Sequence, residues 1–400
     1  MRILFIVKID ENWKTGLFTA THERIKNIFP LIDPASEVYC IKYFDGWFIK
    51  LIKYFFRKNV IMKGEESFTF ENIKYKNIYY KNTLTLKIFN LLGIDSYRNY
   101  FLFKQQRCSY YKFDLVSSHW AVEPASLAYY VYKKTNKSYT ITSHGSDIHT
   151  LPNKSKKLRN IIKRNLLYSK CNIFVSRALK KDAEQFIIKD KKNISIPNGI
   201  DFNKFKMLEK LDIINKSDFK RKVVGYVGNF LEVKRVDALP DIIYRIQKEY
   251  GNEIIFILIG DGKLKKDIEK KCLSLGLNVI FTGKLPPNEV VEYYNAMDVL
   301  MLPSRKEGLG CVAIEAQACG VPVVGSSNGG IPEALRYKEL IVKESNDFNN
   351  EFSDKVLKVL DCEYKISKLE LINFVHKNFE KSLITSKELD VYNNLLNING

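Results

Sequence analysis

The sequence lacks paired cysteines, long apolar runs and an export signal. Its seven cysteines are scattered and include no Cys-x-x-Cys pair, the spacing that zinc and redox sites use, so we expect free thiols in a reducing cytosol. No stretch has the roughly 18 consecutive apolar residues of a membrane-spanning helix. The apolar run Ile3–Val7 ends at Lys8 without a small-residue cleavage site, which predicts a first β-strand and a soluble, cytoplasmic protein.

Recognisable metal ligands are missing as well. No Asp-x-Asp pair follows a predicted strand, and no group of His, Cys or Glu residues has the spacing of a metal site. We therefore predict that the protein binds no metal ion.

Acidic residues are scarce in the first half of the chain. Residues 1–200 contain 35 Lys and Arg against 16 Asp and Glu, whereas residues 201–400 contain 29 of each, so the first half carries the whole net charge of +19. This asymmetry suggests an anionic partner, such as a phospholipid surface, a lipid diphosphate or nucleic acid. A coding bias toward lysine is the alternative, although it should affect both halves. Because no nucleic-acid-reading module is recognisable, we predict no nucleic-acid partner.

Short runs rich in Val, Ile and Leu alternate with amphipathic stretches in two series, separated by the polar stretch Asp201–Lys222. This pattern is typical of parallel strands covered by helices, and with 400 residues it predicts an α/β protein of two doubly wound domains. Ligands of such sheets bind at the carboxyl ends of strands. The predicted strands are residues 3–7, 115–118, 139–142 and 171–175 in the first series, and 223–227, 254–259, 279–282, 299–302 and 321–324 in the second.

A glycine-rich loop follows the predicted strand Val299–Leu302 and leads into the helix-compatible run Cys311–Cys319. The glycines let the backbone approach a ligand, and the start of a helix favours phosphate or hydroxyl oxygens. At helical spacing Glu315 shares a face with Gly308, about 10 Å along the axis. Glu307 and Glu315 are therefore predicted to hold one ligand at two points, the alternative being two solvated surface residues.

Several short segments, two of which contain these acids, form a recognisable set in the order of the chain. They are Ser143-His-Gly-Ser-Asp147, Ile196-Pro-Asn-Gly-Ile-Asp201, Gly225-Tyr-Val-Gly-Asn229, Gly260-Asp-Gly262, Pro303-Ser-Arg-Lys-Glu307-Gly-Leu-Gly310, Ile314-Glu-Ala-Gln-Ala-Cys-Gly320 and Asn328-Gly-Gly-Ile-Pro-Glu333. This set resembles the signature of the family 4 retaining glycosyltransferases of the bacterial surface-polysaccharide type. The resemblance implies the GT-B fold, in which two Rossmann-like domains face a cleft. It also implies an acceptor-binding domain over residues 1–204, a nucleotide-sugar-binding domain over 205–377, and a helix over 378–400 that packs back on the first domain.

The activity that this resemblance implies is the metal-independent, retaining transfer of a hexose-type sugar from a nucleotide sugar to a lipid-linked or growing glycan acceptor. A UDP-sugar is the expected co-substrate, and no other cofactor is expected. The implied catalytic residues are His144, Lys234 and Glu307, while His119 and Asp147 are expected on the acceptor or sugar side. The expected donor-binding residues are Gly16, Asn229, Lys234, Lys284, Leu285, Glu307, Gly308, Leu309, Gly310 and Glu315.

The sequence departs from the family pattern at two places. Asn229 stands where many members carry Arg, and a neutral amide cannot supply the missing cation to a diphosphate. Gly16 is a single glycine where the family usually has a pair. A degenerate GT-B subunit, or a relative that processes nucleotide sugars without transferring them, is therefore the alternative function.

The stretch Gly46–Lys58 interleaves large apolar residues with basic ones. In a helix Lys50, Lys53 and Arg57 would share one face, a pattern that suits an interfacial helix on anionic lipid, with Trp47 and Lys58 also facing the membrane. We therefore expect a polyprenyl-diphosphate-linked acceptor and a peripheral position on the inner face of the cell membrane. An ordinary helix packed on its own domain is the alternative.

Overall fold

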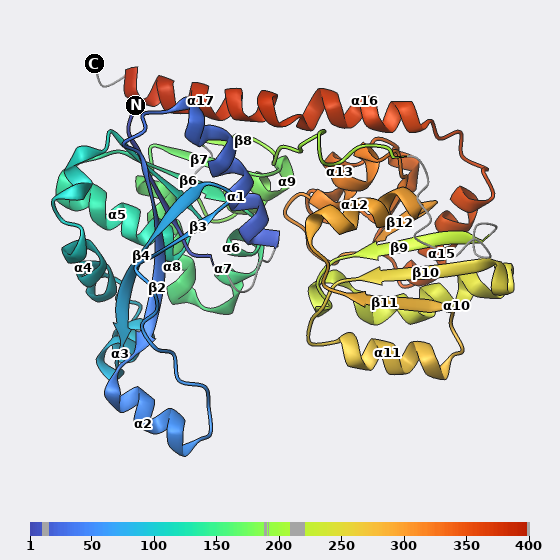
Figure 1. Cartoon of the computed structure of the whole chain (residues 1–400), viewed down its shortest axis with the longest axis horizontal. Helices are drawn as coiled ribbons and strands as arrows, with labels where there is room; N and C mark the ends of the chain where they lie inside the picture. The colour runs from blue at the N-terminus through green and yellow to red at the C-terminus, as the bar shows by residue number, and fades with distance from the viewer. Residues whose placement is uncertain (10–15, 188–189, 191, 209–220, 398–400) are drawn as a thin grey trace. The chain divides into compact units, whose positions relative to one another are not determined.

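The computed structural model describes residues 1–9, 16–187, 190, 192–208 and 221–397 (Figure 1). The chain divides into two compact units, Met1–Pro197 with Ile384–Gly400 (unit 1) and Asn198–Leu383 (unit 2). The first predicted loop after Ile9 and most of the predicted polar linker lie outside the described residues. None of the described helices is long and apolar enough to span a membrane.

Unit 1 is built on an eight-stranded sheet of order β3-β4-β2-β1-β5-β6-β7-β8. All neighbouring strands are parallel except β3 and β4, which form an antiparallel pair at one edge. The strand order reverses between β1 and β5, because β1 pairs with β2 on one side and β5 on the other. The strands are β1 Ile3–Val7, β2 Glu37–Asp45, β3 Ser67–Phe70, β4 Ile73–Asn82, β5 Leu115–His119, β6 Tyr139–Ser143, β7 Cys171–Phe174 and β8 Asn193–Ser195.

Four of these strands, β2, β3, β4 and β8, were absent from the predicted set. β4 alternates tyrosines and isoleucines with lysines and has several exposed side chains, so it lacks the continuous apolar run of a fully buried strand. It pairs with β3 through the turn Glu71-Asn72, where both residues have positive φ, as two-residue hairpins require. The predicted parallel pattern therefore missed a hairpin at the sheet edge.

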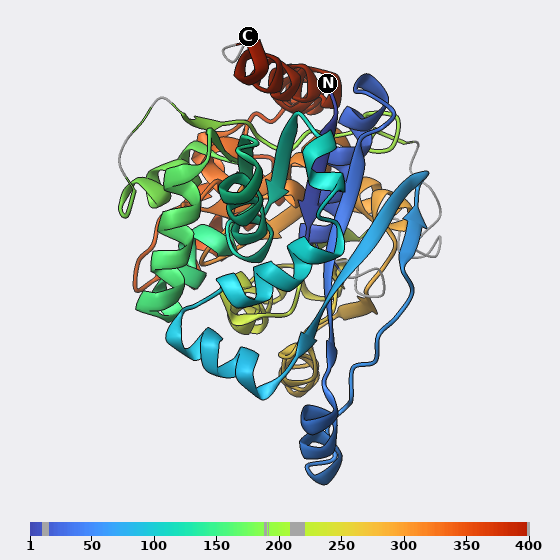
Figure 2. The ribbon, with the colours of Figure 1, turned by 90° about the vertical axis from the view of Figure 1, so that its left-hand side faces the viewer.

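Helices cover both faces of this sheet, so strands such as β1 and β5 are buried along their whole length (Figures 1 and 2). The helix α2, which follows β2, projects beyond the rest of unit 1 in both views. The helices of this unit before residue 198 are α1 Gly16–Ile28, α2 Trp47–Phe55, α3 Leu84–Leu92, α4 Ser96–Gln105, α5 Glu123–Thr135, α6 Ser146–His149, α7 Leu151–Lys154, α8 Lys156–Tyr168 and α9 Arg177–Glu184.

A buried polar network attaches the carboxyl-terminal helix α17 (Lys381–Asn397) to the core of unit 1. The Arg24 guanidinium donates to Glu388 Oε2 at 3.0 Å and to the carbonyl of Pro197 at 3.0 Å. Glu388 Oε1 accepts from Tyr392 Oη at 2.6 Å, and Tyr392 Oη lies 3.0 Å from Ser117 Oγ on β5. Because these side chains are almost fully buried, each polar group depends on its partners in the network.

Unit 2 is a fully parallel six-stranded sheet of order β11-β10-β9-β12-β13-β14. Numbered along the chain this is the 3-2-1-4-5-6 order of a doubly wound α/β sheet, with its switch point between β9 and β12. The strands are β9 Lys222–Val227, β10 Ile254–Ile259, β11 Val279–Gly283, β12 Val299–Leu302, β13 Val323–Ser326 and β14 Ile341–Val342.

Helices also enclose the sheet of unit 2. All six residues of β10 are buried, which explains its unbroken apolar sequence. The predicted strands of this half agree with β9 to β13 within two residues at each end, while the two-residue β14 was not predicted. The helices are α10 Leu239–Tyr250, α11 Lys265–Ser274, α12 Pro287–Ala296, α13 Cys311–Ala318, α14 Ile331–Ala334, α15 Phe348–Leu360 and α16 Lys368–Phe379, and a 3₁₀ turn covers Glu232–Lys234.

The predicted domain boundary at 204/205 lies inside unit 2, which begins at Asn198. Three contacts fix this segment to unit 2. Ile200 forms a parallel bridge with Glu380, Asp201 pairs with Lys381 at 2.7 Å, and the Leu208 amide donates to Asn295 Oδ1 at 2.7 Å. At the other end the chain enters unit 1 at Ile384, later than the predicted 378.

We predict that Glu388→Ala destabilises unit 1 by about 3–5 kcal/mol, because it leaves the buried Arg24 charge without its carboxylate. Urea unfolding monitored by circular dichroism measures the change. The exposed Asn394 on the same helix provides the control, since Asn394→Ala should alter stability by less than about 0.5 kcal/mol. Equal stability of the two variants would contradict the role of the network.

Candidate functional site

Lys234 and Glu307 form an ion pair at the switch point of the unit 2 sheet. Lys234 ends the 3₁₀ turn that follows β9, and Glu307 lies in the loop that follows β12. Because β9 and β12 are neighbouring parallel strands, their carboxyl ends bring these two loops together. Both side chains are largely buried, at 23% and 16% exposure. Two predicted site residues from distant parts of the sequence are thus in direct contact.

The loop after β12 is bound to the turn after β9 by further contacts, which the sequence did not reveal. The backbone amide of Arg305 donates to the carbonyl of Val233 at 2.9 Å, and its guanidinium donates to both carboxylate oxygens of Asp237 at 2.6 and 2.7 Å. The hydrogen bonds from Arg305 lower the pKa of Asp237. The Lys234–Glu307 pair therefore lies between two segments whose backbones are fixed to one another.

Gly329 supports the Glu307 backbone from the other side. Its φ is +57°, and a Cβ at this position would lie 2.0 Å from the Glu307 carbonyl oxygen. The next residue, Gly330, donates its amide to the same carbonyl at 3.2 Å. The Asn-Gly-Gly segment in the sequence thus has a steric function, since only glycine permits this close approach.

Glu315 lies on α13, and its carboxylate accepts a hydrogen bond from Tyr294 Oη at 2.8 Å. Tyr294 is fully buried on α12, and burial together with Glu315 raises the pKa of its hydroxyl. α13 begins only at Cys311, after Gly310 with φ of +91°. Placing Gly308 and Glu315 on one helix face was therefore wrong, because Gly308 precedes the helix.

The other predicted donor-binding residues of unit 2 border the same edge of the sheet. Asn229 follows β9 with its side chain exposed, while its carbonyl accepts from Tyr226 Oη at 3.1 Å. Lys284 is exposed and Leu285 half-buried directly after β11. Leu309 is buried at 3% exposure, which places its side chain in the core and leaves only its backbone for ligand contact.

His119 and His144 are brought together beside the switch point of unit 1. His119 ends β5 and His144 follows β6, and His119 Nδ1 lies 3.2 Å from His144 Nε2. Burial lowers the pKa of His144 to about 3. The pKa of His119 is also lowered well below its usual value, mainly by burial and to a smaller extent by the neighbouring His144. His119 Nε2 and His144 Nδ1 have no hydrogen-bond partner among the described residues. The pair is therefore neutral at physiological pH.

Asp147 shapes the His144 loop through its backbone and does not contact the imidazole ring. Its carboxylate accepts from the amides of His144 and Gly145, at 3.2 and 2.9 Å, and from the amide of Ala121 at 3.0 Å. Since Asp147 is fully buried, it joins the ends of β5 and β6 into one fixed edge. Gly16, predicted to end the first loop, is the exposed first residue of α1.

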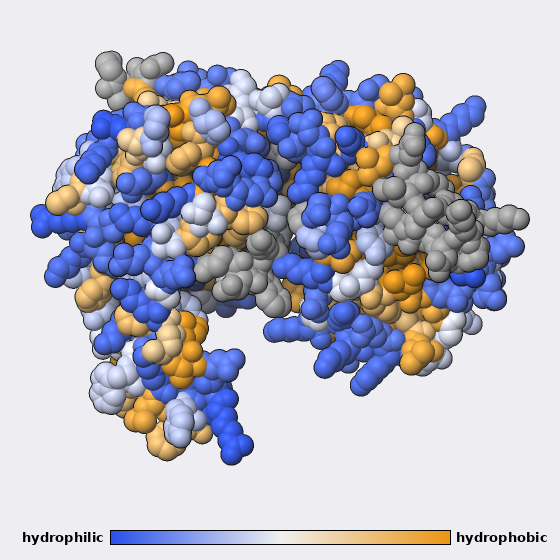
Figure 3. Space-filling model, viewed as in Figure 1, coloured by the Kyte–Doolittle hydropathy of each residue, from blue (hydrophilic) through white to orange (hydrophobic). Residues whose placement is uncertain are grey.

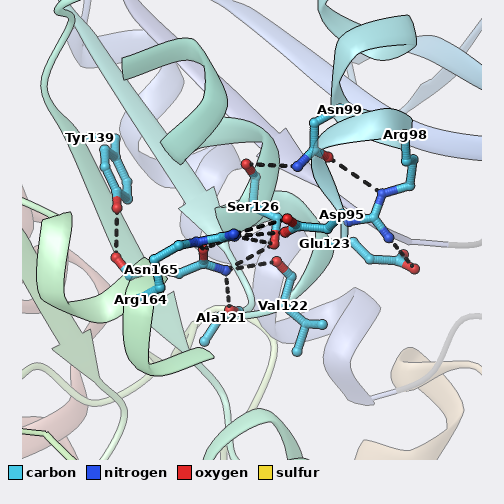
Figure 4. A network of polar contacts seen from close by, with 10 residues as sticks. All are labelled: Asp95, Arg98, Asn99, Ala121, Val122, Glu123, Ser126, Tyr139, Arg164 and Asn165. Atoms are coloured by element: carbon cyan, nitrogen blue, oxygen red, sulfur yellow. Dashed lines mark hydrogen bonds and ion pairs between the residues drawn. The ribbon is translucent and has the colours of Figure 1, made fainter. Parts of the chain in front are cut away.

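Lys8, Glu123 and Arg98 form a second charged cluster at this edge, which the sequence analysis did not identify. Glu123 begins α5 and pairs with Lys8. Its Oε1 lies 3.3 Å from Arg98 Nη1, as Figure 4 shows for these two residues. Burial alone would raise the pKa of Glu123, but Lys8 and Arg98 lower it. Lys8 comes directly after β1, so the rule that functional residues follow strands could have identified it from the sequence.

No group of three or more His, Cys, Asp or Glu side chains suited to a metal ion occurs in the described part of the chain.

The helix α2 exposes most of its apolar side chains. Trp47, Tyr54 and Phe55 of α2, and Phe56 directly after it, are each at least 70% exposed, and of the helix only Ile49 is buried. Apolar residues gather on this projection (Figure 3). The alternative of a helix packed on its own domain therefore does not describe α2.

Two of the predicted membrane-facing residues are placed differently. Lys53 pairs at 2.6 Å with the buried Asp45, which also accepts from the amide of Ile61 at 2.8 Å and closes the base of the projection. Arg57 lies beyond the end of α2 with φ of +49°, so it does not share a helix face with Lys50. Arg57 and Lys58 are exposed, and Lys50 is half-buried.

Comparisons with known proteins agree with this architecture. Residues 209–373 match the family model of glycosyl transferases group 1, and residues 64–204 match that of glycosyltransferase family 4. The chain is 30% identical to the uncharacterized glycosyltransferase MJ1178 of Methanocaldococcus jannaschii over 298 residues, which are 74% of this chain and 78% of the relative. It is 28% identical over 235 residues to TuaC of Bacillus subtilis, named for teichuronic acid biosynthesis, covering 58% of this chain and 57% of that relative.

A similar solved structure is HepE of Anabaena in complex with UDP, with a TM-score of 0.73 and 16% identity over 98% of this chain and all of that one. The same protein has also been solved with UDP-glucose. At this identity the likeness concerns the fold, which is GT-B. Taken with the two family matches and the relative of 30% identity, it shows that the chain belongs to the family 4 glycosyltransferases.

Proposed function

We propose that this glycosyltransferase moves a hexose-type sugar from a UDP-sugar to a lipid-linked or growing glycan in cell-surface polysaccharide synthesis, with retention and without a metal ion. The observation that carries the proposal is the Lys234–Glu307 pair at the switch point of a doubly wound sheet. The teichuronic acid relative supports the substrate class, and the UDP and UDP-glucose complexes of HepE support the donor.

On the donor side, Lys234 supplies the cation that a leaving diphosphate needs as negative charge grows on it. Glu307 holds the Lys234 ammonium between the two loops. When a diphosphate shares this cation, the carboxylate is free to accept hydrogen bonds from sugar hydroxyls. The lysine would act where a metal ion acts in other transferases, which compensates in part for the neutral Asn229.

His119 and His144 suit a site that offers one hydrogen-bond donor and one acceptor without adding charge. Each neutral imidazole carries one N–H, and one of these two protons lies between His119 Nδ1 and His144 Nε2, so of the two nitrogens outside that contact one donates and the other accepts. We propose that the donor nitrogen contacts the leaving phosphate or a sugar oxygen and that the acceptor nitrogen contacts a sugar hydroxyl. The departing diphosphate takes the acceptor proton in a front-face attack, so neither histidine has to act as a base.

On the membrane side, we propose that α2 lies in the interface of an anionic membrane. Residues 46–64 carry five Lys and Arg and no Asp or Glu, and the aromatic side chains of α2 are exposed. Aromatic residues insert at the headgroup level while neighbouring cations attract anionic lipid. Because Asp45 retains Lys53, the attraction would come mainly from Arg57 and Lys58.

We predict that Lys234→Ala lowers kcat for transfer or donor hydrolysis by about 100- to 1,000-fold, because it removes the cation at the leaving group. Glu307→Gln should lower it less, since the amide keeps one hydrogen bond to the lysine. Initial rates with UDP-sugars, together with thermal stabilisation by UDP, measure both effects.

The control for these variants is Lys358→Ala, an exposed lysine on α15 in the same unit, which should leave the rates unchanged. Undiminished turnover by Lys234→Ala would rule out its assignment as the leaving-group cation. Stabilisation by UDP without turnover on any acceptor would favour a degenerate binding subunit instead.

A second prediction concerns pH. His144 has a folded pKa of about 3 and an unfolded one of about 6.5, so below pH 6.5 the unfolded chain binds a proton that the folded chain excludes. The free energy of unfolding should therefore decrease as the pH is lowered, by about 1.4 kcal/mol from pH 8 to pH 5.5. Urea unfolding at both pH values should show this loss in the wild type and a smaller one in His144→Gln. Equal losses would contradict the buried neutral pair.

A third prediction is that Arg57→Gln with Lys58→Gln weakens binding to phosphatidylglycerol vesicles by about 30-fold, since each cation near the surface contributes about 1 kcal/mol. Lys266→Gln with Lys270→Gln, two exposed lysines of unit 2, changes the net charge equally and should leave binding intact. Vesicle flotation at moderate salt measures the affinities. Absence of wild-type binding, or equal losses in both pairs, would contradict the role of α2.

A further inference from the structure

Unit 1 contains a cavity of about 570 Å³ that no step of the proposed transfer uses. It lies at the carboxyl ends of β2 and β4, beneath α3 and α4, and its volume is within the roughly 300–1,000 Å³ of small-molecule sites. Its wall is mainly aromatic and aliphatic. The side chains that matter most are Phe44, Tyr80, Leu86, Tyr97, Arg98 and Phe101.

The aromatic wall favours an apolar occupant. Tyr97 and Phe101 pack edge to face with centroids 5.1 Å apart, and Leu86 is buried at 2% exposure. Water in such a cavity has few hydrogen-bond partners, so an apolar chain that replaces it gains the hydrophobic free energy of both surfaces.

Cations lie at the floor and the rim of this cavity. Arg98 is 6% exposed, with its guanidinium 5.9 Å from the Tyr80 ring centroid. Lys81 and Lys104 are exposed residues that also line the cavity, and none of its described lining residues is Asp or Glu. A ligand with an apolar chain and a negative group matches both parts of the site.

The wall formed by α4 is held in place by a polar network (Figure 4). Arg164 on α8 donates to both oxygens of Asp95, at 2.9 and 2.6 Å, and Asn99 donates to the carbonyl of Ser126 on α5 at 3.1 Å. Arg98 continues this network to Glu123 and Lys8 at the switch point. The cavity is therefore preformed and connects through fixed charges to the edge that carries His119.

We propose that this cavity binds the isoprenoid or acyl chain of a phosphate-bearing lipid next to its phosphate, with Arg98 and Lys104 as the phosphate ligands. The inference rests on the proposed function, because it specifies how a lipid-linked acceptor is selected. Leu84, Ile88, Leu91 and Leu92 of α3 are 49–69% exposed and extend the apolar surface from the cavity for the rest of the chain. The cavity then selects among lipids by contacting the carbon units next to the phosphate.

Farnesyl phosphate is a suitable probe because it carries a short isoprenoid chain on a phosphate. Isothermal titration calorimetry with the full chain should show binding, with farnesol and inorganic phosphate each at least about tenfold weaker. Phe101→Glu, which places a carboxylate at the cavity wall, should weaken farnesyl phosphate by about tenfold or more. Lys104→Gln should weaken it by about threefold to fivefold.

Matched controls come from the same helix region. Tyr100→Glu adds the same charge at a neighbouring exposed position, and Arg107→Gln removes the same charge as Lys104→Gln, but neither residue lines the cavity. Both controls should bind farnesyl phosphate like the wild type. Equal losses in Phe101→Glu and Tyr100→Glu, or equal binding of inorganic phosphate and farnesyl phosphate, would overturn the proposal.

Donor turnover separates this proposal from the proposed function. Phe101→Glu should keep UDP-sugar hydrolysis at the wild-type rate while it loses lipid binding. A wild type that hydrolyses the donor but does not bind farnesyl phosphate would overturn the lipid site alone. Binding of farnesyl phosphate without any donor turnover would support the lipid site and contradict the transferase assignment.

Discussion

Both sheets are covered on their two faces, and this constraint determines where the chemistry of the protein occurs. Side chains within the central strands, such as β1, β5, β10 and β12, are buried in the core, so polar groups there meet a ligand where a strand ends. In unit 2 the ends of β9 and β12 bring Lys234 to Glu307. In unit 1 the ends of β1 and β5 bring Lys8 to Glu123, beside the histidine that closes β5.

The two switch points share one electrostatic design. Each places a lysine from the loop after the unit's first strand against a glutamate from the segment after the strand beyond the reversal. In such a pair the carboxylate offsets part of the cost of desolvating the cation at the sheet edge, and an anionic ligand can later share that cation. The carboxylate left behind can accept hydroxyl hydrogen bonds, which suits ligands that carry both phosphates and sugars.

The sequence predicted those features that depend on local pattern. Apolar runs located the strands of unit 2, and the glycine-rich segments located Glu307 and the loop at His144. The sequence did not predict contacts between distant residues, because no local sequence pattern pairs Lys234 with Glu307, Tyr294 with Glu315 or Arg24 with Glu388. The lysines of β4 interrupt its apolar pattern, so this strand was not predicted. The ion pair with the buried Asp45 directs Lys53 away from the predicted membrane-facing position. The predicted roles of the site residues stay predictions.

The attachment of α17 to unit 1 has a consequence for the order of folding during synthesis. Domains generally fold as they leave the ribosome, the amino-terminal one first. Here Arg24 and Ser117 gain their partners Glu388 and Tyr392 only after the whole of unit 2 has been translated. Unit 2 can therefore complete its core before unit 1 does, and the nascent first unit lacks the counter-ion of Arg24 until the last turns of the chain emerge.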